Sequence, residues 1–285
     1  MLLIFMDKKN PTREPAVAGT FYPANENELK NTILGMLEES SSEQFDGRII
    51  GIISPHAGYI YSGRIAARAY KQIQSKQYDN VIVIAPSHFE HFDGCSIYFG
   101  DYQTPLGIVG TNIEIAESIV SRSPVVVNTS TGHFHEHSVE VQIPFLQICL
   151  RDFKLIPVLM GNQDYPTARA LSSAVHAALL DPGFENQSTL IVGSSDLSHY
   201  YPAKIANVMD GVVINDVEEF DERRLFEDIR SNVCQACGYG AMISTMMIAR
   251  ALGATKSKIL AYGNSGETSQ DYNSVVGYVS GIFYN

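Results

Sequence analysis

Short apolar runs alternate along this chain with amphipathic stretches of helical period. Runs rich in Ile and Val, without polar alternation, indicate strands buried on both faces of a sheet, and they lie at 49–54, 81–85, 155–159 and 190–194. Helices are predicted at 25–38, 112–120, 166–180, 220–229 and 241–252, short strands at 95–99, 103–109 and 125–127, and closing strands at 258–262 and 274–283. The alternation predicts a single α/β domain over residues 1–285, with three α/β/α layers and a mixed, largely parallel central sheet.

The run from Ile49 to Ser54 is followed by Pro55 and then His56. After a glycine-containing turn, Ser62 is the residue we expect to cap a helix over 64–70. The segment is thus predicted to be a strand, a histidine-bearing loop and a helix. Ligands of open α/β sheets bind at this carboxyl edge of the strands.

Two other buried runs end in the same way. Pro86 and His88 follow the run at 81–85, and Asp196 and His199 follow the run at 190–194. Because the carboxyl ends of parallel strands meet at one edge of a sheet, we expect these side chains to converge with His56.

Composition and charge narrow the class of protein. The chain has 285 residues and a net charge of −11 from scattered acidic residues, whereas a nucleic-acid surface needs clustered Lys and Arg. No run is long enough to span a bilayer, and the start, Met1 to Lys9, has too few apolar residues for a signal-peptide core. Four cysteines do not make a disulfide framework in a chain of this length. We therefore expect a cytoplasmic protein with reduced thiols that binds neither nucleic acid nor membrane.

The residue types at the strand ends are those of an open transition-metal site. His56 and His88 would supply neutral imidazoles, and Cys237, at a predicted helix start where the helix dipole favours a thiolate, is the best third ligand. A buried, unreactive cysteine is the plain alternative. Cys234 and Cys237 also form a C-x-x-C pair, for which a redox or zinc role is the minority interpretation, and we expect no functional disulfide between them. His91 is a spare candidate ligand.

A histidine-rich loop precedes the helix that ends near residue 151. Glu136, His137 and Glu140 are the candidates for the wall of the site because they lie where the loop joins the helix. His133 and His135 are expected at the solvated surface. His176, within a helical apolar pattern, is expected to be structural.

The motif Asp196-Leu-Ser-His199 suggests acid–base chemistry. A carboxylate beside a histidine can hold one tautomer of the ring, so His199 is a candidate general base or acid oriented by Asp196. A turn capped by Asp196 is the structural alternative. Ser194 and Ser195 allow a Ser-His-Asp interpretation, but the G-x-S-x-G elbow of such hydrolases is absent from the sequence, and the serines precede the turn rather than sharpen it.

Several motifs, taken together and in order, resemble the Memo family (mediator of cell motility), known in prokaryotes as AmmeMemoRadiSam system protein B. They are Arg13-x-Pro-Ala-Val-Ala-Gly-x-Phe-Tyr-Pro23, Pro55-His-Ala-Gly-Tyr-x-Tyr-Ser-Gly63, Pro86-Ser-His88, Glu136-His-Ser-x-Glu-x-Gln-x-Pro-Phe-Leu146, Ser195-Asp-Leu-Ser-His-Tyr200 and Ala236-Cys-Gly-Tyr-Gly240. No single motif is diagnostic, but the set is highly specific.

The resemblance implies a fold similar to the class III extradiol dioxygenases of the LigB type, in which two histidines and a carboxylate hold a non-haem iron. His56 and His88 match the two histidine ligands, and Cys237 stands where the dioxygenases have the carboxylate. His199 matches the dioxygenase base, with Asp196 beside it. Glu136, His137 and Glu140 match a family loop to which the resemblance assigns no role.

Three functional hypotheses follow. A thiolate is softer than a carboxylate and moves the preference toward copper or zinc, so the first is a redox protein that depends on iron or copper, with zinc as a further candidate. The second is an adaptor that uses the same cleft to dock a peptide or a partner protein. The third is a metal-dependent hydrolase. The resemblance also implies an unidentified small molecule or peptide as ligand, and AMMECR-like and radical SAM proteins as partners.

Overall fold

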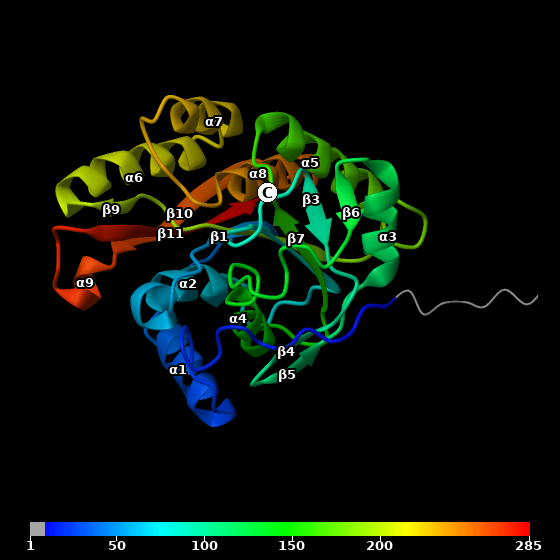
Figure 1. The fold of residues 1–285 in the computed structure, drawn as a ribbon, viewed down its shortest axis with the longest axis horizontal. Coiled ribbons are helices and arrows are strands. Elements are labelled where there is room, and N and C mark those ends of the chain that lie inside the picture. Colours follow the sequence, from blue (N-terminus) through cyan, green and yellow to red (C-terminus); the bar gives the residue numbers. More distant parts are fainter. Residues whose placement is uncertain (1–8) are drawn as a thin grey trace, which may run out of the picture.

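The computed structural model describes residues 9–285, and a nine-stranded mixed sheet runs through the middle of them (Figure 1). Its order is β10 (Lys256–Asn264), β11 (Val275–Tyr284), β1 (Ile49–Ser54), β8 (Thr189–Ser194), β2 (Asn80–Pro86), β7 (Lys154–Met160), β3 (Cys95–Ile97) and β6 (Val126–Asn128), with β9 (His199–Tyr201) paired to β11. The central strands β1, β8, β2 and β7 are parallel, whereas β11 pairs antiparallel with both β1 and β10, and β3 pairs antiparallel with β7 but parallel with β6. A separate hairpin is formed by β4 (Tyr102–Thr104) and β5 (Gly107–Val109).

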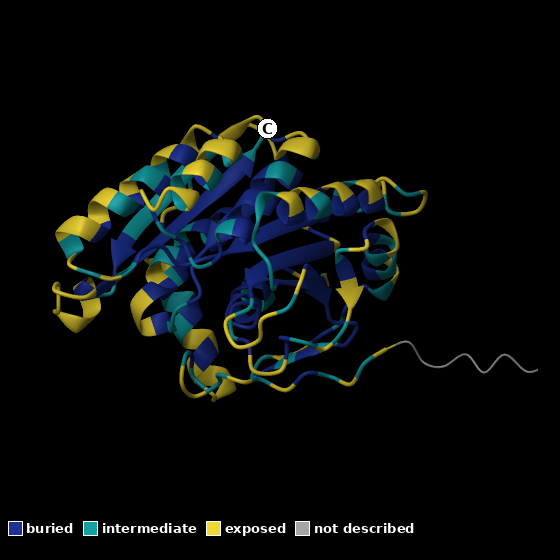
Figure 2. Cartoon of the chain, turned by 45° about the horizontal axis from the view of Figure 1, so that its top comes forward, coloured by how far each residue is buried: buried dark blue, intermediate teal, exposed yellow. Residues whose placement is uncertain are grey.

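Helices cover both faces of the sheet, which makes the three layers expected from the sequence (Figure 1). One layer contains α1 (Glu26–Glu38), α2 (Tyr59–Ile73) and α4 (Gln142–Cys149). The other contains α3 (Ile113–Arg122), α5 (Tyr165–Leu179), α6 (Ala203–Glu218), α7 (Glu222–Arg230) and α8 (Tyr239–Ala251), and the short α9 (Gly266–Ser269) precedes β11. Figure 2 shows the buried strands between helices whose outer faces are exposed.

Two apolar cores explain the uninterrupted strand patterns. In β1, Ile50 and Ile53 pack into the core beneath α8, while Ile49 and Ile52 pack into the core beneath α2. Every residue of β1 is buried. Burying one such side chain stabilises the fold by about 1.5–3 kcal/mol, so a polar residue on either face of this strand would be costly.

Most predicted elements are present, the short β9 and α9 were not predicted, and two larger differences have a physical explanation. First, α2 begins at Tyr59 with Gly58 at its N-cap, whereas Ser62 lies inside the helix and donates its hydroxyl proton to the Ala57 carbonyl at 2.9 Å. Second, α6 was not predicted. Its buried side contains the acids Asp210 and Asp216, which interrupt the apolar period from which a helix is recognised.

The helices of the structure can be compared with the length and apolarity that a membrane span requires. Within residues 9–285, none is both long and apolar enough to cross a bilayer. The residues 1–8, which contributed most of the argument against a signal peptide, lie outside the described residues.

A buried ion pair joins the N-terminal segment to the histidine-rich loop. Arg13 Nη1 lies 2.6 Å from Glu140 Oε2, and both side chains are fully buried. The same guanidinium donates to the carbonyls of His133 and Glu136, at 2.6 and 2.5 Å. Glu140 also accepts hydrogen bonds from Ala16 N, Val17 N and the Tyr22 hydroxyl. The Arg13–Glu140 pair therefore holds the loop at 133–140 against the N-terminal segment.

We predict that Glu140→Ala destabilises the protein by about 3–5 kcal/mol, because it leaves the buried Arg13 guanidinium without a counter-charge. The measurement is urea unfolding followed by circular dichroism. Glu39→Ala is the matched control, since Glu39 pairs with Arg64 at the exposed surface and its loss is expected to cost at most about 1 kcal/mol. Equal effects of the two substitutions would contradict a structural role for the buried pair.

Candidate metal centre

Parallel strands bring His56 and His88 to one edge of the sheet, as expected. His56 lies just beyond β1 and His88 just beyond β2, with β8 between the two strands. Cys237 reaches the same point from the segment before α8. Their ligand atoms all lie within 4.8 Å of one another. A tetrahedral ion with bonds of 2.0–2.3 Å separates such atoms by roughly 3.3–3.6 Å, so the three donors fit one ion after small adjustments.

The Cys237 thiol lies against His56, with 3.1 Å between Sγ and Nε2. The following Gly238 allows this approach, since a Cβ atom there would come within 2.2 Å of the Ser194 carbonyl oxygen. We expected the helix start to lower the pKa of Cys237. Instead, burial and then the charge of Asp196 raise it, outweighing the hydrogen bond that Asp196 N donates to Sγ. Without a cation the sulfur is therefore a neutral thiol.

A hydrogen-bond chain sets the tautomer of His56. Ser194 Oγ lies 2.9 Å from His56 Nδ1, donates its proton to the Ser138 carbonyl at 2.7 Å and accepts from Gln142 Nε2 at 2.8 Å. Because the hydroxyl has a single proton, His56 Nδ1 is the donor, and Nε2 keeps a free lone pair toward Cys237. Burial lowers the pKa of His56 well below its usual value, so the ring stays neutral. Nothing in the sequence spacing singles out Ser194 or Gln142 for this role.

The tautomer of His88 is set by a carboxylate. Glu136 accepts from His88 Nδ1 at 2.9 Å and from the His88 backbone N–H at 2.5 Å. Burial alone would raise the pKa of Glu136, but the hydrogen bonds that it accepts from His88 lower it to about 2, so the carboxylate is ionised. In the neutral ring of His88 this contact places the proton on Nδ1 and the lone pair on Nε2. The His88 side chain is 29% exposed, whereas His56 is 1% exposed, so the site opens to solvent on the His88 side.

His137 adds a third imidazole beside these two. Its ring stacks on His88 with centroids 4.8 Å apart, and it meets His56 edge-on at 5.5 Å. Its Nδ1 lies 3.3 Å from the same Glu136 oxygen that accepts from His88. His88, Glu136 and His137 thus form a second group of possible donors, also within 4.8 Å of one another. His137 lies at the wall of the site, where the sequence placed it.

The remaining candidate residues of the histidine-rich loop, and His91, agree only in part with the positions expected from the sequence. His135 is exposed, as expected, but His133 is fully buried and the expectation of a surface position is wrong. Its ring lies between the Tyr102 hydroxyl, 2.7 Å from Nδ1, and Ser96 Oγ, 3.0 Å from Nε2. Burial lowers its pKa to about 3. Glu140 forms its ion pair with Arg13 beneath the loop and is not exposed in the wall of a cleft. His91 is exposed and belongs to neither of the two groups of possible metal donors.

His199 and Asp196 are not paired as expected. Asp196 Oδ1 accepts from the His56 backbone N–H at 2.8 Å, whereas His199 Nδ1 lies 2.7 Å from the Leu197 carbonyl. That carbonyl requires a proton on Nδ1 and leaves Nε2 of His199 unprotonated in the neutral ring. Asp196 therefore positions the loop of His56, and the Leu197 carbonyl selects the tautomer of His199.

The two serines after β8 do not present a nucleophile. Ser194 is fully buried, and its proton goes to the Ser138 carbonyl. Ser195 is equally buried, donates to the Asp196 carbonyl at 2.8 Å and accepts from Gly238 N at 2.9 Å. These contacts give no support to a Ser-His-Asp hydrolase.

The four cysteines are free in the structure. Cys234 is fully buried and packs in the core beneath α8, while Cys237 contacts His56. The absence of a functional disulfide between them stays a prediction.

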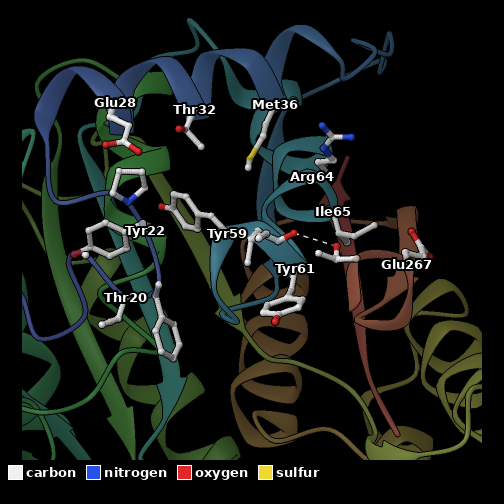
Figure 3. Close-up of a pocket in the computed structure, with 15 residues that line it drawn as sticks. Thr20, Tyr22, Glu28, Thr32, Met36, Tyr59, Tyr61, Arg64, Ile65 and Glu267 are labelled. Atoms are coloured by element: carbon white, nitrogen blue, oxygen red, sulfur yellow. Dashed lines mark hydrogen bonds between the residues drawn. The ribbon is translucent and has the colours of Figure 1, made fainter. Parts of the chain in front are cut away.

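A groove of about 840 Å³ lies beside the site, between α1, α2 and the N-terminal segment (Figure 3). Aromatic and apolar side chains and a few charged ones line it, among them Phe21, Met36, Tyr59, Ile60, Tyr61 and Arg64. Phe21 joins the groove to the site, since its ring also contacts His137 with centroids 4.7 Å apart.

We predict a pH-dependent stability contribution from Asp196. Burial raises its pKa to about 7, despite hydrogen bonds from the backbone N–H groups of His56 and Ala57. A carboxyl whose pKa is higher in the folded state stabilises the fold below its unfolded pKa of about 3.9, and this contribution is lost as the pH rises to about 7. Asp196→Asn should remove this loss, which is at most about 4 kcal/mol.

The measurement is urea unfolding of metal-free wild type and Asp196→Asn between about pH 4 and pH 8. The stability of the wild type should fall relative to the variant over this range. Parallel curves would show that Asp196 is already ionised at low pH.

Comparisons with known proteins find relatives over nearly the whole chain. The family model described as Memo-like protein matches residues 13–282. A MEMO1 family protein of Methanocaldococcus jannaschii is 36% identical over 291 residues, covering 96% of this chain and 99% of the relative. MEMO1 family proteins of Methanobrevibacter smithii, 39% identical over 95% of this chain and 99% of the relative, and of Nitrosopumilus maritimus, 37% identical over 93% and 97%, are similar to it as well. By its sequence the chain belongs to the Memo-like protein family.

Proposed function

We propose that this protein binds a transition-metal ion through His56 Nε2, His88 Nε2 and Cys237 Sγ and acts as a redox protein that depends on iron or copper. The observation that supports it best is the hydrogen bond at each Nδ1, which in the neutral rings leaves the lone pair on Nε2, together with the grouping of both histidines and Cys237 so that one donor atom of each lies within 4.8 Å of the others. Two imidazoles and a thiolate suit copper and iron, with zinc as a further candidate. Such an ion, when bound, supplies one-electron chemistry or activation of oxygen.

The chain's own residues prepare this site. His56 is buried and neutral, so its ring need not lose a proton in order to bind, and Glu136 accepts a hydrogen bond from Nδ1 of His88 and fixes the orientation of that ring. Cys237 must lose one, because its thiol is neutral without a cation. His199, half-buried and with Nδ1 held by Leu197, has Nε2 available to accept or return a proton near the site. We assign it the role of a nearby acid or base and not of a ligand.

We predict that anaerobic titration with copper(I) or iron(II) gives one bound ion per chain. His56→Ala, His88→Ala and Cys237→Ser should each lower the affinity at least tenfold, because two donors hold an ion much less tightly than three. His199→Ala should leave metal content unchanged. Elemental analysis of protein purified without a histidine tag gives the metal content.

His135→Ala is the control, since it removes an exposed histidine of the same loop. A loss of metal with His199→Ala as large as with His56→Ala would make His199 a ligand. Wild-type protein that takes up neither ion would contradict the proposed function.

The groove favours a second candidate function, docking of a peptide. Ile60 and Tyr61 on its rim are 71% and 43% exposed, and the groove has the size of a ligand site. This adaptor function would use the groove without any metal. It would also explain an apolar surface that the metal site does not require.

We predict that peptides selected on the protein from a random displayed library lose binding on Ile60→Ser. Val208→Ser is the matched control, because Val208 on α6 is also 71% exposed but lies outside the groove. His88→Ala should have no effect on this binding. Peptides that respond equally to Ile60→Ser and Val208→Ser would argue against docking in the groove.

A further inference from the structure

The two candidate imidazole ligands are held by acceptors of different charge. The acceptor for His56 Nδ1 is the neutral hydroxyl of Ser194, whereas the acceptor for His88 Nδ1 is the carboxylate of Glu136. Both contacts are 2.9 Å long. One candidate ligand is therefore held at Nδ1 by a neutral acceptor and the other by an anionic acceptor, at the same distance.

The Glu136 carboxylate is itself not free to bind an ion. Its oxygens accept from His88 N at 2.5 Å, from His88 Nδ1 at 2.9 Å, and from His137 N and Ser138 N at 2.9 Å each. Glu136 as a whole is only 2% exposed to solvent. Direct coordination would take an oxygen from donors that are buried beside it, at a cost of about 1–3 kcal/mol for each donor left unpaired. The second donor group, with His137, is therefore better explained as support for His88.

The position of this carboxylate is fixed from two sides. Arg13 Nη2 donates to the Glu136 carbonyl, and Ser138 Oγ donates to the Pro86 carbonyl at 2.8 Å, which ties the loop to the end of β2. The charge of Arg13 is balanced by Glu140, at 2.6 Å. The negative charge of Glu136 therefore lies next to the site, hydrogen-bonded to the ring of the candidate ligand His88.

We propose that Glu136 is a positioning residue that sets the preference of the site for doubly over singly charged ions. The inference rests on the proposed metal site. A carboxylate hydrogen-bonded to a ligand imidazole fixes the ring and raises its basicity, and its attraction to the ion grows with the charge of the ion. With Cys237 as thiolate, Glu136 supplies a second negative charge, which matches a dication. Ser194 orients His56 but adds no charge.

The test compares the affinities of wild type, Glu136→Gln and Ser194→Ala for cobalt(II) and copper(I), by anaerobic competition at one pH. Glu136→Gln should lower the cobalt(II) affinity roughly 10- to 100-fold and the copper(I) affinity by much less, so that the ratio of the two affinities changes at least about tenfold. Ser194→Ala should weaken both ions by similar factors and leave the ratio unchanged. An unchanged ratio in Glu136→Gln, or an equal change in Ser194→Ala, overturns the proposal.

Glu136→Asp guards against a loop that fails to fold, because it keeps the charge on a shorter side chain. Its affinity ratio should stay close to that of the wild type, and a tenfold change there would show that geometry, not charge, sets the preference. Imidazole nitrogen NMR of the metal-free protein gives an independent measurement: His88 should carry a proton on Nδ1 in the wild type, and a neutral ring with its proton on Nε2 alone would contradict the assigned role of Glu136. Wild-type protein that binds neither ion refutes the proposed function itself, whereas binding with an unchanged ratio refutes only the role of Glu136.

Discussion

The parallel pairing of β1 with β8, and of β8 with β2, is the constraint on which the site depends. It places the loops after β1 and β2 on either side of β8 and aims His56 and His88 at the same space. Apolar residues on both faces of these strands hold this arrangement rigid, since the strands lie between two helical layers. The chemistry is therefore carried by loops, while their spacing is set by the core.

Buried polar groups then fix the loops and rings that the parallel strands bring close together. The loop at 133–140 is held from beneath by Arg13, whose charge is met by Glu140, and it holds His88 through Glu136. Taking these charges out of water is costly, and the cost is offset only because nearly every oxygen and N–H has a partner. The site and the stability of the N-terminal segment are consequently linked through one network.

The hydrogen bonds around the two histidines share one result. Each Nδ1 is a donor, to Ser194 in one case and to Glu136 in the other, so the lone pair of each neutral ring is on Nε2, and both histidines belong to one donor group with Cys237. Such control of the tautomer by a second layer of residues is common in metal sites. The groove beyond Phe21 gives this site a neighbouring surface of a different, apolar character.

The sequence by itself determined the layered α/β fold and the meeting of His56 with His88, because buried parallel strands have a distinctive apolar pattern and a common edge. It also pointed to Cys237, through its place at a helix start. Only the tertiary structure decided the burial of His133, the pairing of Glu140 with Arg13, and the division of Asp196 from His199. Spacing along the chain records which residues share an element, but hydrogen-bond partners more than a hundred residues apart are chosen by packing, which no local pattern contains.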